Sequence, residues 1–264
     1  MAKFIIQGGK SLEGEIEVAG AKNAALKMMA SALLTDETVQ LNHVPDIKDI
    51  QTMKAILDKL GASVKFANHT LTINCSGVKK PEPDYQLVKH MRGSVVVIGP
   101  LLARFDETKI PQPGGCLIGS RPIDTHINAL KQLDVQFEQD QDYYYFKTKG
   151  LKGTRVLLDE MSVTATENIL MAATLAKGKT EIHLAASEPE IEDLAKMLNK
   201  MGAKIKGAGT PVITVEGVKK LHGTEHNVIP DRIEAGTLAI AAAVSRGNVK
   251  IKNVIPNHLD IFLQ

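Results

Sequence analysis

The chain has 264 residues, of which 44% are apolar and 4% aromatic, so it is long enough to bury a sizeable core in one or two domains. Its 32 lysines and arginines nearly balance its 30 aspartates and glutamates, without long runs of like charge. This balance argues against nucleic acid or an anionic membrane as the main partner. No apolar run resembles a secretory signal or a membrane span, so we expect a globular, cytoplasmic protein.

One pattern recurs four times along the chain: an apolar helix, a short strand, a turn with proline and an acidic residue, a second helix, then another strand. The first copy predicts helices at residues 24–34 and 53–60 around a strand at 39–41. Equivalent elements of the next two copies are predicted within residues 93–137 and 166–205. The fourth copy begins at Arg232 and stops in mid-pattern, so we expect the sequence to be part of a longer protein.

Alternating helices and strands with short connections predict an α/β fold of repeated βαβαββ-like units, in which three complete copies enclose a shared helical core. Antiparallel hairpins are predicted at residues 63–74, turning at Asn68 and His69, and around residues 206–211. Residues 217–230 are interpreted as a link to the next part of the chain.

The two cysteines have different settings, and two do not make a disulfide framework. Leu71, Ile73 and Cys75 alternate on one face of a strand, which predicts an inert core thiol. Cys116 lies in a stretch too rich in glycine and proline for helix or strand, with Arg121 close by. This setting predicts a mobile loop with an accessible thiol of lowered pKa, although an unused loop cysteine stays an alternative.

Cationic side chains stand where helices are predicted to begin. Lys22 stands just before the first predicted helix, whose first backbone N–H groups are expected to be free. Arg92 precedes the helix of the second copy, and Arg121 precedes Asp124, which is an expected N-cap. Guanidinium and ammonium groups bind phosphate and carboxylate strongly when partly desolvated. Together the three cations favour a substrate that carries several negative charges.

Ser162 opens the helix of the third copy, where Thr164 and Glu167 have capping-box spacing. Ordinary capping explains this spacing without a ligand. His222 and His226 are metal-ligand types, but glycines nearby disfavour a regular helix and no third ligand is evident, so no metal site is predicted. A dinucleotide fingerprint and a Gly-x-Ser-x-Gly elbow are absent from the sequence.

Seven motifs follow one another along the whole chain. They are Gly20-Ala-Lys-Asn-Ala-Ala-Leu, Met91-Arg-Gly-Ser, Gly99-Pro-Leu-Leu-Ala-Arg, Pro113-Gly-Gly-Cys-x-Ile-Gly-x-Arg-Pro-x-Asp, Ser162-Val-x-Ala-Thr-Glu-Asn, Glu188-Pro-Glu-Ile and Pro230-Asp-Arg-Ile-Glu. In order and spacing they resemble the UDP-N-acetylglucosamine 1-carboxyvinyltransferase (UDP-N-acetylglucosamine enolpyruvyl transferase) family.

The resemblance implies transfer of the enolpyruvyl group of phosphoenolpyruvate to the 3-hydroxyl of UDP-N-acetylglucosamine, with release of phosphate and without a metal or organic cofactor. This is the first committed step of peptidoglycan synthesis. The family fold is an inside-out α/β barrel of two three-repeat domains with the site between them. Residues 23–229 would form one complete domain, and residues 1–22 and 230–264 part of a second, through which the chain is expected to self-associate.

By matching position, the resemblance implies that Cys116 is the proton donor and fosfomycin target, and that Lys22 is the second catalytic residue. Lys22 and Arg121 would hold phosphoenolpyruvate, Asn23 the sugar, and Ser162 and Val163 the diphosphate. The full implied substrate-binding set is Lys22, Asn23, Arg92, Arg121, Pro122, Ile123, Asp124, Thr125, Ser162 and Val163.

Two positions depart from the family pattern: Thr164 replaces a usual glycine and is expected to crowd the diphosphate, and Glu160 replaces a lysine of some members. The family's aspartate general base belongs to a later portion, so we expect this chain alone to be inactive. A binding-only UDP-sugar domain is the alternative from another class. The sister enzyme acting on shikimate 3-phosphate lacks the Cys116 loop and is less favoured.

Overall fold

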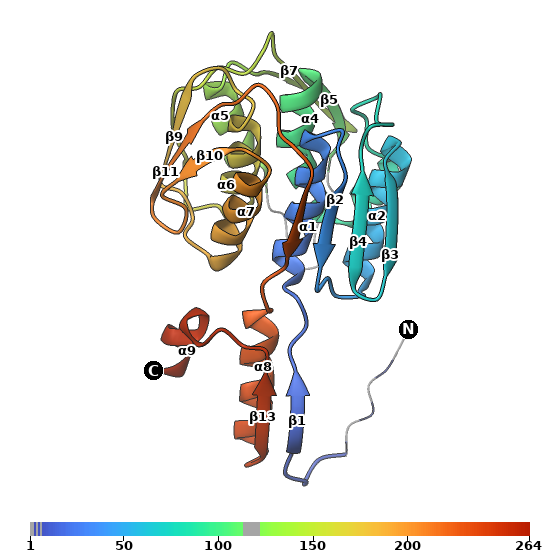
Figure 1. Cartoon of the computed structure of the whole chain (residues 1–264), viewed down its shortest axis with the longest axis vertical. Helices are drawn as coiled ribbons and strands as arrows, with labels where there is room; N and C mark the ends of the chain where they lie inside the picture. The colour runs from blue at the N-terminus through green and yellow to red at the C-terminus, as the bar shows by residue number, and fades with distance from the viewer. Residues whose placement is uncertain (1–2, 4, 6, 113–121) are drawn as a thin grey trace.

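The structure, a computed structural model, describes residues 3, 5, 7–112 and 122–264. Most of these residues form one body in which strands surround helices (Figure 1). A slender extension holds β1 (Glu13–Glu17), α8 (Arg232–Val244) and β13 (Asn248–Lys252), followed by η3 (Pro256–Leu259) and α9 (Asp260–Leu263). In this extension β1 and β13 pair in parallel, so segments from near the two ends of the sequence lie side by side.

The main body contains the repeated units. The first holds α1 (Lys22–Ser31), η1 (Ala32–Leu34), β2 (Val39–Asn42), α2 (Lys48–Leu60), β3 (Ser63–Ala67) and β4 (Thr70–Asn74). The second, after α3 (Tyr85–His90), holds η2 (Arg92–Val97), α4 (Ile98–Phe105), β5 (Glu107–Pro111), α5 (Asp124–Gln132), β6 (Gln136–Gln139) and β7 (Tyr143–Lys147). The third holds β8 (Arg155–Leu157), α6 (Val163–Ala173), β9 (Lys179–His183), α7 (Pro189–Lys200), β10 (Lys204–Lys206) and β11 (Val212–Glu216). The predicted order of helix, strand, helix and further strands is confirmed in each unit.

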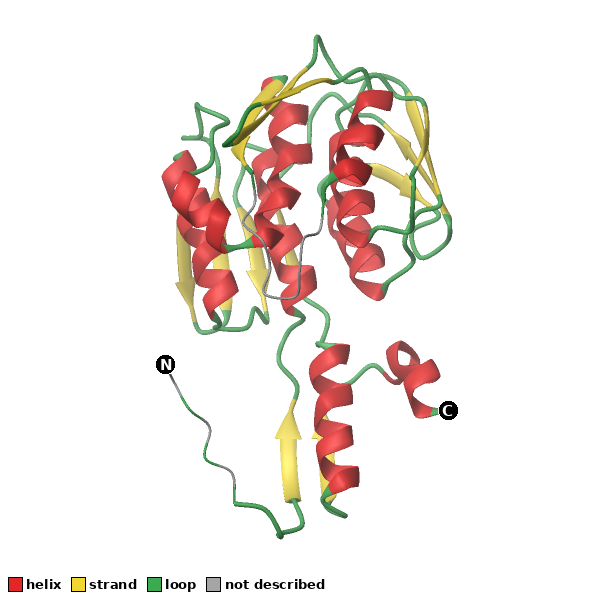
Figure 2. Cartoon of the chain, turned by 180° about the vertical axis from the view of Figure 1, so that it is seen from behind, coloured by secondary structure: helices red, strands yellow, loops and turns green. Residues whose placement is uncertain are grey.

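In the main body the sheets lie at the periphery and the helices lie between them (Figures 1 and 2). Every residue from Ala24 to Ser31 of α1 and from Ala165 to Ala173 of α6 is buried. A helix buried on all sides is a core helix rather than a surface one. The predicted α/β fold with a shared helical core is therefore confirmed.

Two of the three outer sheets combine antiparallel strands with one parallel strand, whereas the sheet of β5, β7 and β6 is antiparallel throughout. The sheet orders are β12-β2-β4-β3, β10-β11-β9-β8 and β5-β7-β6. β12 (Thr224–Asn227) joins β2 in parallel, and β8 joins β9 in parallel. The extension repeats this arrangement with β1 and β13, but the predicted division at residues 23–229 stays a prediction.

The first predicted hairpin is confirmed in detail. Asn68 and His69 connect β3 to β4 with φ angles of 50° and 58°. Two successive residues with positive φ are typical of a two-residue type I′ turn, whose twist matches that of the strands. The turn predicted around residues 206–211 likewise connects β10 to β11.

Two expectations about secondary structure are wrong. Residues 93–103 are not one α-helix: η2 comes first and α4 begins only at Ile98. Pro100 has no N–H to donate, so it is accommodated in the first turn of α4, and valines 95–97 lower the helix propensity before it. Residues 217–230 are not merely a link, since they contain β12, whose sequence lacks apolar alternation and whose position is set by backbone pairing with β2.

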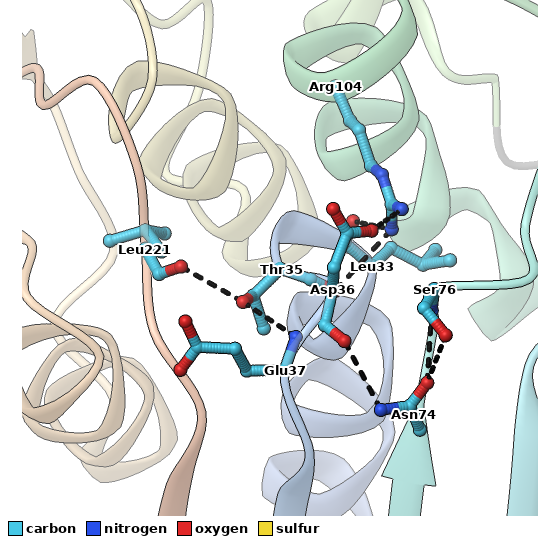
Figure 3. A network of polar contacts seen from close by, with 8 residues as sticks. All are labelled: Leu33, Thr35, Asp36, Glu37, Asn74, Ser76, Arg104 and Leu221. Carbon is cyan, nitrogen blue, oxygen red and sulfur yellow. Dashed lines mark hydrogen bonds and ion pairs between the residues drawn. The ribbon is translucent and has the colours of Figure 1, made fainter.

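The turn after η1 connects three parts of the body (Figure 3). The Arg104 guanidinium of α4 donates to the carbonyl oxygens of Leu33 at 3.0 Å and Thr35 at 3.4 Å, and pairs with Asp36. Thr35 Oγ1 donates to the carbonyl oxygen of Leu221 at 2.9 Å. Arg104 thus satisfies carbonyl groups that the helix end leaves without an intrahelical donor.

The Glu37 carboxylate binds residues 220–223, the segment that leads to β12. Its carboxylate accepts from the Gly223 backbone N–H at 3.0 Å, from Lys220 Nζ at 2.9 Å, and has His222 Nδ1 at 3.3 Å. The Gly223 hydrogen bond, followed by those from Lys220 and His222, lowers the pKa of Glu37 from 4.5 to about 2. The ionised form is therefore the one that the folded protein stabilises.

We predict that Glu37→Gln lowers stability at pH 7 and that the difference from the wild type narrows as pH falls from 4.5 towards 2. A carboxylate with a lowered pKa stabilises the fold above its unfolded-state pKa and loses this contribution as it is protonated. Urea unfolding at several pH values measures the difference. Glu138→Gln, at an exposed strand position, is the matched control. A difference independent of pH would contradict the assigned role.

A charged pair is buried between α1 and α6. Glu167 is fully buried, and neither carboxylate oxygen accepts a hydrogen bond from any residue in the described ranges. The Lys27 ammonium lies 3.4 Å from Glu167 Oε1 and is itself almost wholly buried. Burial raises the pKa of Glu167 to about 7, although the Lys27 charge opposes this shift. Lys27 is therefore the partner that makes the ionised carboxylate tolerable in the core.

We expect Lys27→Met to destabilise the protein by about 3–5 kcal/mol at pH 8, because it leaves a carboxylate buried without a counter-ion. At pH 5 the loss should be smaller, since Glu167 is then protonated in the folded state and needs no cation. Urea unfolding of Lys27→Met and of the double variant Lys27→Met/Glu167→Leu tests this. The double variant should recover most of the loss at pH 8. Equal destabilisation at both pH values would show that packing, not charge, is responsible.

Candidate functional site

The beginnings of η2, α5 and α6 converge on a cavity of about 610 Å³. We call it the α5–α6 cavity. It is lined by Arg92, Pro122, Asp124, Thr125, His126, Asp159, Glu160, Ser162 and Thr164. Because backbone N–H groups at helix starts have no intrahelical acceptor, a cavity at this place suits anionic groups.

Five of the expected substrate-binding residues line this cavity: Arg92, Pro122, Asp124, Thr125 and Ser162. Arg92 donates to the Pro122 carbonyl oxygen at 3.5 Å, and this contact bridges η2 and the residues before α5.

Two further expected residues, Ile123 and Val163, do not present side chains to the cavity. The Ile123 side chain is 2% exposed, and Val163 packs against the hydrophobic core. Only their backbone groups are left for ligand binding.

The expected caps at these helix starts are corrected by the structure. Asp124 is the first residue of α5, and Ile123 occupies the N-cap position without a side-chain hydrogen bond. Ser162, not Thr164, caps α6: its hydroxyl accepts from the Ala165 backbone N–H at 3.4 Å. Thr164 lies inside the helix, two residues after the N-cap position.

Lys22 and Asn23 lie elsewhere, in a second cavity of about 430 Å³ between α1 and α8. The backbone N–H of Lys22 donates to Asp231 Oδ2 at 3.2 Å, and its ammonium lies 3.0 Å from Asp49 Oδ2. The N–H group expected to be free for an anion thus already has a carboxylate partner. Lys22 and Asp49 are each 41% exposed, so solvent and ligand can compete for the ammonium.

The electrostatic character of the α5–α6 cavity is mixed. Its described lining combines one guanidinium, from Arg92, with the carboxylates of Asp124, Asp159 and Glu160. Thr125 Oγ1 donates to Glu160 Oε1 at 3.4 Å. Carboxylates and hydroxyls suit donor groups of a ligand, while Arg92 and the helix starts suit acceptors. The predicted Cys116 and Arg121 lie outside the described residues.

His126 is a cavity residue that the sequence did not single out. It is 3% exposed, its Nε2 lies 3.0 Å from Thr164 Oγ1, and its Nδ1 lies 2.9 Å from Asn168 Nδ2. Burial, reinforced by the nearby Arg92 charge, lowers the pKa of His126 to about 4. The available signal was helical spacing, which places His126 beside Ile127 and Leu130 on the buried face of α5.

The other sequence expectations have plain outcomes. Cys75 is fully buried and its pKa is raised to about 12 by burial, which confirms the inert core thiol. His222 contacts Glu37, whereas His226 Nε2 lies 2.8 Å from Asp193 Oδ1. Within the described ranges, no three His, Cys, Asp or Glu side chains are grouped to hold a metal ion. In the same ranges no helix has the length and apolar character needed to cross a membrane.

Solved structures with a similar fold are enolpyruvyl transferases and define the class of fold. The enolpyruvyl transferase NikO from Streptomyces tendae has a TM-score of 0.78 at 21% identity, over 88% of this chain and 55% of that one. EPSP synthase from Acinetobacter baumannii has a TM-score of 0.74 at 20% identity, over 95% of this chain and 57% of that one. At such identities the likeness shows the fold alone.

The family profile described as EPSP synthase (3-phosphoshikimate 1-carboxyvinyltransferase) matches residues 6–264, and the chain belongs to this family. Among similar curated relatives, proteins named UDP-N-acetylglucosamine 1-carboxyvinyltransferase from Koribacter versatilis and Myxococcus xanthus are 48% and 49% identical over the whole chain. UDP-N-acetylglucosamine 1-carboxyvinyltransferase 2 from Carboxydothermus hydrogenoformans is 51% identical over 98% of the chain. The chain spans 62%, 64% and 62% of the lengths of these three relatives.

We predict that His126 titrates near pH 4 and stays neutral at pH 7, because its buried ring cannot solvate a charge and faces the Arg92 cation. Histidine ring chemical shifts followed by NMR between pH 3.5 and 8 measure this directly. A His126 midpoint above pH 6 would contradict the neutral assignment.

Proposed function

We propose that this chain forms part of an enzyme that transfers the enolpyruvyl group of phosphoenolpyruvate to the 3-hydroxyl of UDP-N-acetylglucosamine and releases phosphate, the first committed step of peptidoglycan synthesis. The observation that carries the proposal is the 48–51% identity to relatives of that printed name along essentially all of this chain. Identity to the solved EPSP synthase is 20%. The acceptor is therefore proposed to be the UDP-sugar rather than shikimate 3-phosphate.

The α5–α6 cavity supports this choice of substrate by its chemistry. A nucleotide sugar offers donors, namely the uracil imide and the sugar hydroxyls, as well as acceptors on its diphosphate. Asp124 and Asp159 can accept from the donors, while Arg92 and the first N–H groups of α6 can donate to phosphate. A cavity lined only by cations would suit a simple polyanion better.

In the proposed mechanism the 3-hydroxyl gives up its proton to a general base and its oxygen bonds to C2 of phosphoenolpyruvate, while the C2–C3 double bond takes up a proton at C3, which gives a tetrahedral adduct. Loss of a proton from C3 and of phosphate from C2 then restores the double bond, so the enolpyruvyl ether and phosphate are the products. Cys116 is proposed to supply the proton, and Lys22 with Arg121 to hold the phosphoenolpyruvate anion. Lys22 must then share its ammonium between Asp49 and the substrate.

Calorimetry with the 264-residue chain tests the choice of substrate. UDP-N-acetylglucosamine should bind, and shikimate 3-phosphate should give no heat. Arg92→Ala should weaken binding of UDP-N-acetylglucosamine about ten-fold or more, as expected for loss of a charged hydrogen-bond donor. Arg155→Ala, at an exposed strand position, is the matched control and should bind like the wild type. Binding of shikimate 3-phosphate alone would replace the proposal by the sister activity.

Thiol labelling followed by mass spectrometry provides an independent check on Cys116. The chain carries its own control, because buried Cys75 should resist a reagent such as iodoacetamide while Cys116 reacts. UDP-N-acetylglucosamine should change the rate at Cys116 and leave Cys75 unaffected. A rate at Cys116 that is insensitive to the UDP-sugar, in a chain that binds it by calorimetry, would contradict the proposed position of Cys116 at the substrate site.

A further inference from the structure

The amide of Asn168 has a single orientation that satisfies its neighbours. Its Oδ1 accepts from the Gly99 backbone N–H at 2.8 Å, and its Nδ2 donates to the Val95 carbonyl oxygen at 2.9 Å. A flipped amide would set NH₂ against N–H and oxygen against oxygen. Because Asn168 is fully buried, water cannot relieve such a mismatch.

This orientation determines the hydrogen positions on His126. The second hydrogen of Asn168 Nδ2 points to His126 Nδ1 at 2.9 Å, so Nδ1 accepts and the ring hydrogen is on Nε2. The lowered pKa of His126 keeps the ring in this neutral form at pH 7. Nε2–H then donates to Thr164 Oγ1 at 3.0 Å.

The Thr164 hydroxyl consequently acts as an acceptor towards His126 and keeps its own hydrogen for another partner. Within the described ranges no second hydrogen bond of this hydroxyl is found, and Thr164 lines the α5–α6 cavity. Asn168 and His126 therefore leave the Thr164 hydroxyl with a hydrogen that it can donate. This arrangement depends on the backbone of η2 and α4, because their groups fix the orientation of the Asn168 amide.

We propose that Thr164 is a specificity-determining residue whose hydroxyl, oriented by His126 and Asn168, donates to a phosphate oxygen of the nucleotide diphosphate in the α5–α6 cavity. This inference rests on the proposed function. An uncharged donor is useful here because Asp124, Asp159 and Glu160 face the same space as Arg92. It strengthens phosphate binding without adding another buried ion pair. The side chain expected to crowd the diphosphate thus becomes one of its ligands.

Calorimetry with UDP and with uridine separates the phosphate contact from the rest of the ligand. Thr164→Val keeps the shape but removes the hydroxyl, and should weaken UDP binding about ten-fold or more while uridine binding is unchanged. Thr164→Ser keeps the donor and should stay within about two-fold of the wild type. Thr52→Val, on the distant helix α2, is the matched control, since it also removes one threonine hydroxyl.

A double-mutant cycle tests the positioning role of His126. His126→Leu should weaken UDP binding, whereas His126→Gln, whose amide can accept from Asn168 and donate to Thr164, should restore part of the affinity. His126→Leu combined with Thr164→Val should lose no more than Thr164→Val alone, because both changes remove the same contact. Thermal unfolding of each variant shows whether it is folded before binding is compared.

The outcomes distinguish this inference from the function on which it rests. Wild-type chain that fails to bind UDP would overturn both. Wild-type binding that Thr164→Val leaves intact, or an equal loss for UDP and uridine, would overturn the Thr164 assignment alone. Fully additive losses in the cycle would remove His126 from the proposal and assign it a structural role.

Discussion

The enclosure of α6 is the constraint on which the remaining structure depends. Because the helix is buried along nearly its whole length, each polar side chain on it needs a partner from another element. Thr166 Oγ1 accepts from the Ala186 backbone N–H at 3.1 Å, Glu167 faces Lys27, and Asn168 connects η2, α4 and α5. Three successive residues thus connect α6 to five other segments of the chain, and these contacts position the helix start that lines the cavity.

The backbones of α4 and α6 are in close contact below that cavity. A Cβ atom at Gly99 would lie 2.3 Å from the carbonyl oxygen of Asn168, so only glycine permits the observed distance. Arg92 begins η2, which leads directly into α4, and Ser162 immediately precedes α6. Gly99, which does not itself line the cavity, therefore helps to define the distance between the groups that do.

The sequence predicted the repeated units well, because apolar periodicity and turn residues such as Asn68 and His69 are local signals. It did not predict β12, which lacks alternation and exists through pairing with β2. Helix starts at Arg92, Asp124 and Ser162 were predicted to carry polar groups, but their convergence on one cavity, and the separation of Lys22 from it, depend on packing. The carboxylate partners of Lys22, Asp49 and Asp231, are distant from it in the sequence and could not be predicted from local patterns. The same holds for Thr164 and Asn168, the hydrogen-bond partners of His126.

The strand exchange between units has a consequence for the order in which the chain can fold during synthesis. β2 gains its parallel neighbour β12 only when residues 224–227 have been synthesised. β1 likewise has no partner strand until residues 248–252 have been synthesised. Until then each leaves an exposed edge whose N–H and C=O groups are open to wrong pairing. The first unit therefore cannot complete its sheet before the third unit has been made. Synthesis of residues 224–227, rather than of the first repeat itself, is the event that allows this outer sheet to close.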